Sequence, residues 1–455
     1  MKQYDVVIIG FGKGGKTLAS FLGKRGKKIA VVEKSKKMYG GTCINVACIP
    51  TKYLIHEAKK LQSRKNQEWG EKAKAYASVM ARKKEFIDKL RLGSFKKVNQ
   101  PEVVEVIDGF ASFVDEHTLS VEQENGMIQL KAETIIINTG ATPVLPDIAG
   151  IKNNPVVYTS DTLLNEERLP KTLSIIGGGY ISLEFASMYA DFGSKVCIFD
   201  RGDTFLPKED ENVAKVVREA LEKKGIEIYL QARSKKVKGD QLVIEFTNEN
   251  SEKIFQSDAI LLATGRKPYT EGLQLDKAGV KTGERQEIVV NHQLRTSTPH
   301  VFAIGDVKGG PQFTYVSLDD YRIVADQLTG GKEYDKEKRG HLPYSVFIDP
   351  PLSRIGLTEK EAKEKNLNFD LFTLAAADIP RAKLIGETEG MLQVIVEKDS
   401  DKILGAALFC AESYEIINLI KYNMDTKDTY YTLKNQIYTH PSMSESLNYL
   451  FDELV

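Results

Sequence analysis

The sequence predicts an α/β fold that contains two dinucleotide-binding βαβ units. Glycine-rich loops follow apolar strands at Gly10 and again at Gly177, and each unit reaches an acidic residue, Glu33 or Asp200, after the same 23 positions. Both units also end alike, in an apolar strand that runs into Thr-Gly, two further residues and Pro. A plan that repeats along the chain in this way predicts two nucleotide sites in one protein.

The composition is that of an ordinary globular protein with several domains. The 455 residues exceed what one hydrophobic core usually serves, and 63 basic residues balance 63 acidic ones, so nothing favours nucleic acid as a partner. No stretch approaches the ~18 apolar residues of a membrane helix, and no targeting segment is recognisable. We therefore expect a cytoplasmic protein that binds neither a membrane nor nucleic acid.

The first unit carries the dinucleotide fingerprint. The apolar run YDVVIIG reads as a buried strand, and a helical stretch follows the loop of Gly10, Gly12 and Gly15. Glycines at these places permit a tight turn, a close approach of the backbone to a pyrophosphate, and close packing of the helix. Glu33, at the end of the next strand, is placed to bind ribose hydroxyls.

The second unit repeats this arrangement with one departure. Its loop contains Gly177 and Gly179, but Ser182 stands where Gly or Ala usually lets the helix pack on the strand, so we expect a slightly looser fit. Asp200 would repel a 2′-phosphate, which favours NADH, although the adjacent Arg201 could offset that repulsion. Two dinucleotide sites in one chain suggest that electrons pass from one cofactor to another.

Two of the four cysteines, Cys43 and Cys48, lie five residues apart directly after the first unit. In a regular helix this spacing separates the Cα atoms by roughly 8–9 Å, whereas a disulfide needs about 4.4–6.8 Å, so the helix start must be distorted. Such a bridge is strained and easily reduced, and a helix N-terminus stabilises the resulting thiolate, which predicts a redox-active pair. Zinc and an inert thiol pair are the alternatives. Because C-x4-C is a poor ligand spacing and His56 alone cannot complete a zinc site, we expect no metal.

The segment GGTCINVACIPTK, residues 40–52, resembles the signature of the FAD-dependent pyridine nucleotide–disulfide oxidoreductases, the family of lipoamide dehydrogenase, glutathione reductase and mercuric reductase. The resemblance extends to VFAIGD, which ends at Asp306, and to Thr-His-Pro around His440 with Glu445 near the C-terminus. It implies FAD on the first unit, NADH or NADPH on the second, and a homodimer.

The fold that this resemblance implies has two Rossmann-like dinucleotide-binding domains, one for FAD and one for NAD(P), plus a C-terminal α+β dimerisation domain. The implied boundaries are 1–147 and 266–339 for the two parts of the FAD domain, 148–265 for the NAD(P) domain and 340–455 for the dimerisation domain.

The resemblance also implies a role for each residue of the redox centre. Cys48 lies nearest the flavin, and Cys43 becomes the exposed thiol that attacks the substrate, with a pKa that we expect the helix start to lower. Lys52 pairs with Glu184 near the flavin's reactive nitrogen and tunes it electrostatically.

The acid–base group implied by the resemblance is His440. Glu445 orients its imidazole, and in the family this histidine reaches the cysteine pair of the other subunit, so that the active site is shared within the homodimer. The remaining residues implied to bind cofactors are Thr42, Ala111, Gly140, Asp306 and Gly265.

The sequence departs from the usual patterns of lipoamide dehydrogenases, mercuric reductases and glutathione reductases, and these departures argue against the substrates of those enzymes. Tyr438 stands where lipoamide dehydrogenases usually carry a second His, the last cysteine is Cys410 whereas mercuric reductases carry a C-terminal pair, and CIPTK replaces the CVPKK that is usual in glutathione reductases. We therefore expect a small-molecule oxidant as the substrate.

Within the family the sequence resembles the RclA-like branch, which is linked to reactive chlorine species, copper reduction and hypothiocyanous acid reduction. It rests on GFGKGGKTLA, PQFTYVSLDDYRI and THPSMSESLNYLF, among other segments. It implies that hypothiocyanous acid is reduced to thiocyanate. Copper(II) or another reactive oxidant, mercuric-reductase-like or lipoamide-dehydrogenase-like activity, an NADH oxidase or peroxidase, and a non-enzymatic flavin redox sensor stay open as alternatives. In PQFTYVSLDDYRI itself we expect an ordinary helix start with Asp319 and Asp320 at the surface.

Overall fold

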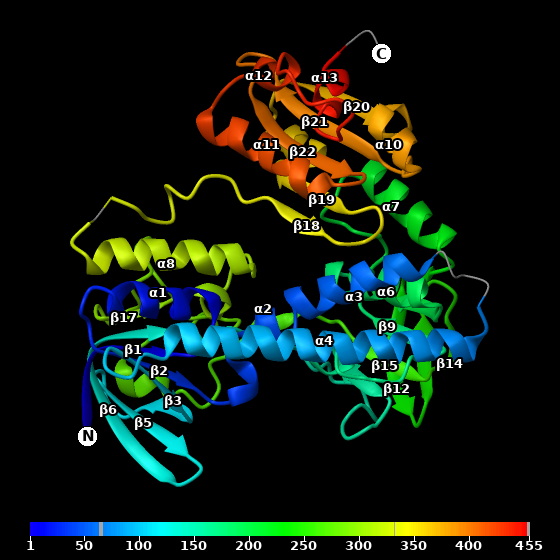
Figure 1. Cartoon of the computed structure of the whole chain (residues 1–455). Coiled ribbons are helices and arrows are strands. Elements are labelled where there is room, and N and C mark those ends of the chain that lie inside the picture. The colour runs from blue at the N-terminus through cyan, green and yellow to red at the C-terminus, as the bar shows by residue number, and fades with distance from the viewer. Residues whose placement is uncertain (63–66, 332, 453–455) are drawn as a thin grey trace.

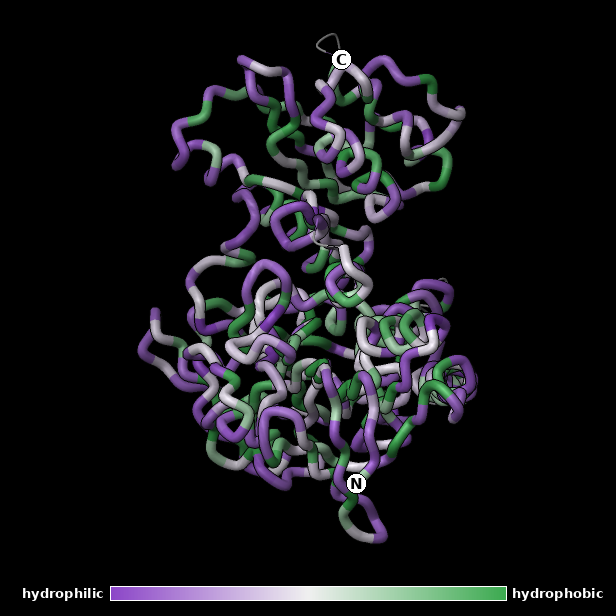
Figure 2. Tube along the Cα trace, turned by 90° about the vertical axis from the view of Figure 1, so that its left-hand side faces the viewer, coloured by the Kyte–Doolittle hydropathy of each residue, from purple (hydrophilic) through white to green (hydrophobic). Residues whose placement is uncertain are grey.

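The structure is a computed structural model that describes residues 1–62, 67–331 and 333–452. Three main sheets organise it, two in the lower part of Figure 1 and one in the upper part, near the C-terminus. Figure 2 shows hydrophilic residues along much of the outer turns of both parts, as expected where each part buries a core of its own. Within the described ranges no helix combines the length and apolar character needed to cross a bilayer.

The first sheet has seven strands and is parallel around β1. Its order is β3-β2-β1-β6-β5-β4, and β17 pairs with β6, so a segment far along the chain joins the N-terminal strands. Successive side chains of β1 alternate between two buried clusters, with Val7 on one face and Ile8 on the other, as expected for a sheet covered on both sides. The strands are β1 (Lys2–Ile9), β2 (Ile29–Glu33), β3 (Val104–Asp108), β4 (Phe110–Phe113), β5 (Thr118–Gln123), β6 (Gly126–Ile137) and β17 (Val301–Ala303).

The second sheet has five parallel strands in the order β11-β10-β9-β15-β8. Its helix α6 (Tyr180–Phe192) connects β9 to β10 and is buried along most of its length, because it packs between the sheet and α3. The strands are β8 (Val157–Thr159), β9 (Thr172–Ile176), β10 (Lys195–Phe199), β11 (Glu227–Tyr229) and β15 (Ala259–Leu262), and a small antiparallel sheet adds β12 (Ala232–Lys238), β13 (Gln241–Phe246) and β14 (Ser251–Gln256).

The third sheet is antiparallel and has the order β18-β19-β22-β21-β20. Helix α11 (Ser413–Thr426) packs against it and closes a separate apolar core (Figure 1). The strands are β18 (Tyr344–Val346), β19 (Leu352–Gly356), β20 (Phe369–Ala375), β21 (Met391–Glu397) and β22 (Ile403–Phe409).

Helices join the two lower sheets. Helix α4 (Trp69–Val98) runs across both of them, and α1 lies beside α8 over the first sheet (Figure 1). The remaining elements of this part are α1 (Lys13–Gly23), α2 (Thr42–Asn45), α3 (Cys48–Leu61), β7 (Ala141–Pro143), α5 (Ser160–Leu163), α7 (Glu211–Lys223), β16 (Arg266–Pro268) and α8 (Thr314–Leu328). The upper part adds α9 (Glu359–Glu364), α10 (Pro380–Ile385), α12 (Tyr431–Lys434) and α13 (Ser446–Leu450).

Candidate active site

The first glycine loop packs closely against Asn138. A Cβ at Gly10 would come 2.4 Å from the carbonyl oxygen of Asn138, and a Cβ at Gly12 would come 2.6 Å from the Oδ1 of the same side chain. Asn138 Oδ1 also accepts the N–H of Gly15 at 2.9 Å. The N–H of Gly14 donates to the hydroxyl of Ser317 at 3.1 Å, so the amides of both glycines in the first turn of helix α1 are paired inside the protein. Sequence reasoning did not identify Asn138, which follows the strand that ends the unit.

Glu33 ends β2 beside this loop. Its Oε2 accepts the N–H of Phe11 at 3.0 Å and its Oε1 accepts the N–H of Ser35 at 3.2 Å, so the carboxylate holds the loop as well as facing it. Burial raises its pKa, and the two backbone hydrogen bonds oppose that shift.

The second glycine loop is more open. A Cβ at Gly177 would come 2.6 Å from the carbonyl oxygen of Ala263, but a Cβ at Gly179 would meet nothing within 4 Å. Gly178 was not predicted, yet it is the glycine that lies against Asp200, since a Cβ there would come 2.2 Å from the carboxylate. Arg201 is exposed beside Asp200. The predicted departure, Ser182, is fully buried in α6, and its hydroxyl has no hydrogen-bond partner among the described residues.

The other predicted cofactor residues lie in several different elements. Asp306 is largely buried, which raises its pKa, and its carboxylate makes no hydrogen bond within the described part of the chain, so it fits a ligand hydroxyl. Gly140 has a φ of +72°, and a Cβ there would come 3.8 Å from the hydroxyl of Thr42, which begins α2. Ala111 is buried in β4, and Gly265 has a φ of +109° with open space around it. The glycine cradle and the unpaired acid together fit FAD.

The two cysteines lie on two consecutive helices, Cys43 on α2 and Cys48 at the start of α3. Helix α2 ends at Asn45, and α3 begins at Cys48 after a break in which Ala47 takes φ −145° and ψ −107°. The predicted distortion of the helix start is therefore confirmed, because the break replaces the regular helix that would hold the cysteines apart. The side chain of Asn45 fixes α2 by donating to the carbonyl oxygens of Tyr39 and Gly41.

The negative charge of the reduced pair rests on Cys48. Both residues are free thiols, and the hydrogen bond from Cys43 lowers the pKa of Cys48 to about 6 while the same contact raises the pKa of Cys43. Thr314 and Lys52 also favour the Cys48 thiolate, and the Thr314 hydroxyl lies 3.4 Å from its sulfur. The expectation of a lowered pKa at Cys43 is therefore wrong for this state, since two adjacent sulfurs share one proton and Cys43 holds it.

Lys52 and Glu184 are brought together as an ion pair. The Lys52 ammonium donates to both carboxylate oxygens at 2.7 and 2.6 Å, and Glu184 Oε1 also accepts the N–H of Phe347 at 2.9 Å. The pair thus ties α3, which starts at Cys48, to α6 of the second unit and to the segment after β18.

His440 and Glu445 form a second pair, in the C-terminal part. His440 Nδ1 lies 2.9 Å from Glu445 Oε2; the histidine side chain is 70% exposed and the glutamate 6%. A buried carboxylate therefore fixes one ring nitrogen and leaves the other facing outward. No contact between His440 and either redox cysteine of the same chain occurs among the described residues.

Asp319 and Asp320 are not at the surface as expected. Both are buried in α8, and the guanidinium of Arg339 donates to both carboxylates. Asp320 also accepts the N–H of Gly305 at 2.7 Å and lies 3.3 Å from Lys308. Sequence spacing could not show this, because the partners lie up to 20 residues away in a separate loop.

Comparison with known proteins agrees with this arrangement. Residues 4–320 match the pyridine nucleotide-disulphide oxidoreductase family, and residues 342–450 match its dimerisation domain. The probable pyridine nucleotide-disulfide oxidoreductase RclA of Escherichia coli strain K12 is 44% identical over 99% of both chains, and a mercuric reductase of Lysinibacillus sphaericus is 32% identical over 95% of this chain and 80% of its own. A solved structure, the Cu(II) complex of the HOCl-induced flavoprotein disulfide reductase RclA from Escherichia coli, superposes with a TM-score of 0.93 at 44% identity and 99% coverage of both chains.

Proposed function

The chain belongs to the pyridine nucleotide-disulphide oxidoreductase family, and we propose that within it the chain reduces hypothiocyanous acid to thiocyanate at the expense of NADH. It is an NAD(P)H-dependent flavoprotein disulfide oxidoreductase that uses FAD. The feature that supports the choice of oxidant is the pair of free thiols, in which the contact between the two sulfurs lowers the pKa of Cys48 and raises that of Cys43. A small electrophile needs only such a pair and an acid to protonate its leaving group.

The two thiols and His440 perform the chemistry in balanced steps. Cys43 gives its proton to His440 of a second copy of the chain, and its sulfur attacks the electrophilic sulfur of hypothiocyanous acid. The departing hydroxide takes the proton from His440 and leaves as water. The Cys48 thiolate then attacks the Cys43 sulfur, which forms the disulfide and expels thiocyanate. FAD, when bound, accepts electrons from NADH and returns them to the disulfide.

Residues around the pair hold it ready for these steps. Lys52 and Thr314 keep the negative charge at Cys48, and Glu184 fixes the position of the Lys52 ammonium. Glu445 holds Nδ1 of His440, so that the other ring nitrogen carries the transferable proton.

Turnover of the purified, FAD-loaded protein tests the oxidant. NADH consumption should rise at least about tenfold when hypothiocyanous acid is added to an aerobic sample. A rate equal to that with oxygen alone would remove hypothiocyanous acid as the substrate and leave only the family's general activity.

Copper(II) reduction is the second candidate, because the superposed Escherichia coli structure is a Cu(II) complex. Reduction of a metal ion by the dithiol needs no protonated leaving group. His440→Ala should therefore depress turnover of hypothiocyanous acid much more than reduction of copper(II). An equal loss with both oxidants would contradict the acid role of His440.

A shared active site accompanies this proposal. The exposed imidazole of His440 would serve the cysteine pair of a second copy of the chain in a cytoplasmic homodimer. Mixed dimers of Cys43→Ser and His440→Ala chains should recover about half of one wild-type dimer's sites, because one of the two sites then combines an intact cysteine pair with an intact histidine. Verified mixed dimers without activity would show that His440 does not act across the interface.

A further inference from the structure

We propose that Arg91, on α4, is a positioning residue for Cys43. Through the side chain of Asn45 it holds helix α2, and it thereby keeps the sulfur of Cys43 in contact with that of Cys48. This role belongs to the thiol pair itself and does not depend on which oxidant the pair reduces.

Helix α2 is too short to keep its own position. It contains only the four residues Thr42–Asn45, and an isolated helix of this length has no stability in water. It starts after Gly41, which has a φ of +79°, and it ends before the break at Ala47. Contacts from outside the helix must therefore decide where it places Cys43.

Asn45 supplies such contacts with both ends of its side-chain amide. The amide nitrogen donates to the carbonyl oxygens of Tyr39 at 3.0 Å and Gly41 at 2.8 Å, and Oδ1 accepts from Nε of Arg91 at 2.9 Å. Asn45 is only 6% exposed, so an unpaired amide oxygen there would be costly. The end of α2 is thus joined on one side to the chain before it and on the other side to α4.

Arg91 is held in the orientation that this hydrogen bond needs. Its Nη1 donates at 2.7 Å to Oδ1 of Asp88, which lies one turn earlier on α4. A partly exposed ion pair of this kind adds little stability, but it restricts the rotation of the guanidinium. Since α4 spans 30 residues and runs across both lower sheets, the donor stands on an extended support (Figure 1).

A second contact from α4 holds the chain before α2. Phe95, one helical turn after Arg91, stacks on Tyr39 with the ring centroids 4.8 Å apart. On the other side, a Cβ at Gly41 would come 2.7 Å from the Cα of Gly12 in the first glycine loop. The redox segment, residues 39–48, is therefore held between α4 and that loop.

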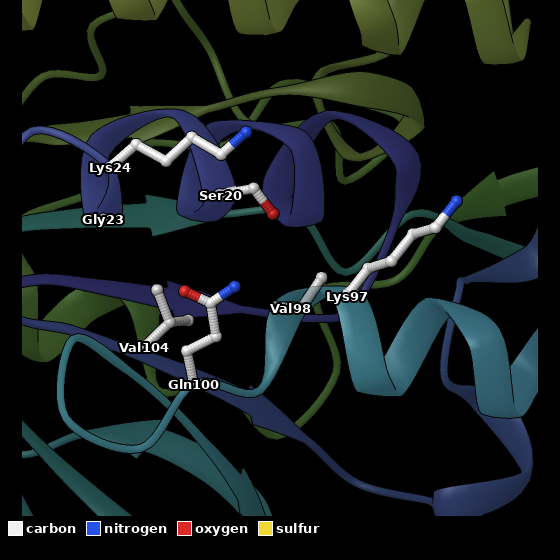
Figure 3. Close-up of a pocket in the computed structure, with 7 residues that line it drawn as sticks. All are labelled: Ser20, Gly23, Lys24, Lys97, Val98, Gln100 and Val104. Carbon is white, nitrogen blue, oxygen red and sulfur yellow. The ribbon is translucent and has the colours of Figure 1, made fainter.

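The last turn of α4 borders a cavity instead. Lys97 and Val98 line this cavity of about 370 Å³ together with Ser20 and Gly23 of α1 (Figure 3). Lys97 is exposed, and within the described residues it makes no hydrogen bond to the redox segment. It therefore offers a matched control, a basic residue of the same helix without the contact that Arg91 makes.

Without the Arg91 bond, α2 could move and the two sulfurs could separate. The contact from Cys43 is what most lowers the pKa of Cys48, so separation would raise that pKa from about 6 toward the ordinary thiol value. Disulfide closure would also slow, since Cys48 must then reach a sulfur whose position is no longer fixed.

Alkylation of the reduced holoenzyme by iodoacetamide at a series of pH values tests this role without any oxidant. The reagent reacts with thiolates, so the pH profile of alkylation at the redox pair, followed by peptide mass, gives the midpoint of the more acidic thiol. Arg91→Met should raise this midpoint by about one pH unit, a tenfold change in proton affinity. Arg91→Gln should keep the midpoint, because its amide nitrogen is bonded to Cδ as Nε is in arginine, and Lys97→Met should keep it as well.

The control variants separate the hydrogen bond from the charge. Equal shifts in Arg91→Met and Arg91→Gln, or a shift in Lys97→Met, would make positive charge responsible and overturn the proposal, as would an unchanged midpoint or loss of FAD in Arg91→Met. Asn45→Leu, which removes the amide without adding a charge, should raise the midpoint at least as much as Arg91→Met, and no shift there would contradict the route through Asn45. Turnover gives an independent check, since Arg91→Met should lower kcat about fivefold and leave the KM for NADH unchanged. An unchanged kcat would also overturn the proposal.

Discussion

The two glycine loops follow one plan in the sequence but are built differently in space. In the first, added Cβ atoms at Gly10, Gly12 and Gly15 would all come within 2.8 Å of Asn138 or Ile8. In the second, Gly177 and Gly178 are enclosed as tightly, at 2.6 and 2.2 Å, but Gly179 faces open space. The two loops therefore differ at the glycine that precedes the helix, where the first is closed by Asn138 and the second is open. Identical spacing thus does not imply an identical way of binding.

The largest expected effect comes from removing the thiols that follow the first unit. Cys43→Ser and Cys48→Ser should each lower turnover at least about 10³-fold, because neither can form the disulfide, while both loops keep their cofactors. Cys43→Ser should show a long-wavelength charge-transfer band, because we propose that Cys48 is the thiolate nearest the oxidised flavin, and Cys48→Ser should not. The band in the Cys48 variant instead would reverse the roles of the two sulfurs.

Adding one methyl group to each loop sharpens the comparison directly. Gly12→Ala should lose FAD, because its Cβ would lie 2.6 Å from Asn138 Oδ1, an atom that also accepts the N–H of Gly15. Gly179→Ala should keep FAD and raise the KM for NADH about tenfold, which corresponds to about 1.4 kcal/mol. Flavin absorbance per chain and steady-state kinetics measure the two effects. Equal FAD loss in both variants would break the comparison.

Asp200 and Glu33, the acidic residues that end the two units, should differ in their effect on the preference for NADH over NADPH. Asp200→Asn should move the ratio of kcat/KM for NADH and NADPH from about ten toward one, since the repulsion of a 2′-phosphate is removed. Glu33→Gln, the matched change in the first unit, should leave that ratio unchanged. A wild-type preference for NADPH would contradict the role of Asp200.

The smallest effect is a titration at the junction of the two units. The pKa of Cys48 is lowered to about 6, so its sulfur is charged above that pH and becomes protonated below it. The charge-transfer band of the reduced holoenzyme should therefore be constant near pH 8 and fall by half near pH 6. A midpoint near the ordinary thiol value would show that Cys43 and Thr314 do not stabilise the thiolate.

Local patterns in the sequence were enough to predict the α/β class, two dinucleotide sites and the break between the cysteine-bearing helices. The resemblance to the family added FAD and the residues of the Lys52–Glu184 and His440–Glu445 pairs. These features depend on spacing along the chain or on motifs of a few residues, which each segment carries by itself. The domain boundaries and the roles assigned to the site residues stay predictions.

Only the tertiary structure decided which of the two cysteines has its pKa lowered, where Asp319 and Asp320 lie, and which lysine contacts Gly40 in the redox segment. Each depends on residues that come together from distant segments, as Thr314 does beside Cys48 and Lys16 beside Gly40. A pKa or an ion pair depends on distance and burial in space, and neither can be read from positions along a chain. The sequence therefore determined the kind of chemistry, and the packing of α8 beside the cysteine-bearing helices α2 and α3 determined how the charges are arranged for it.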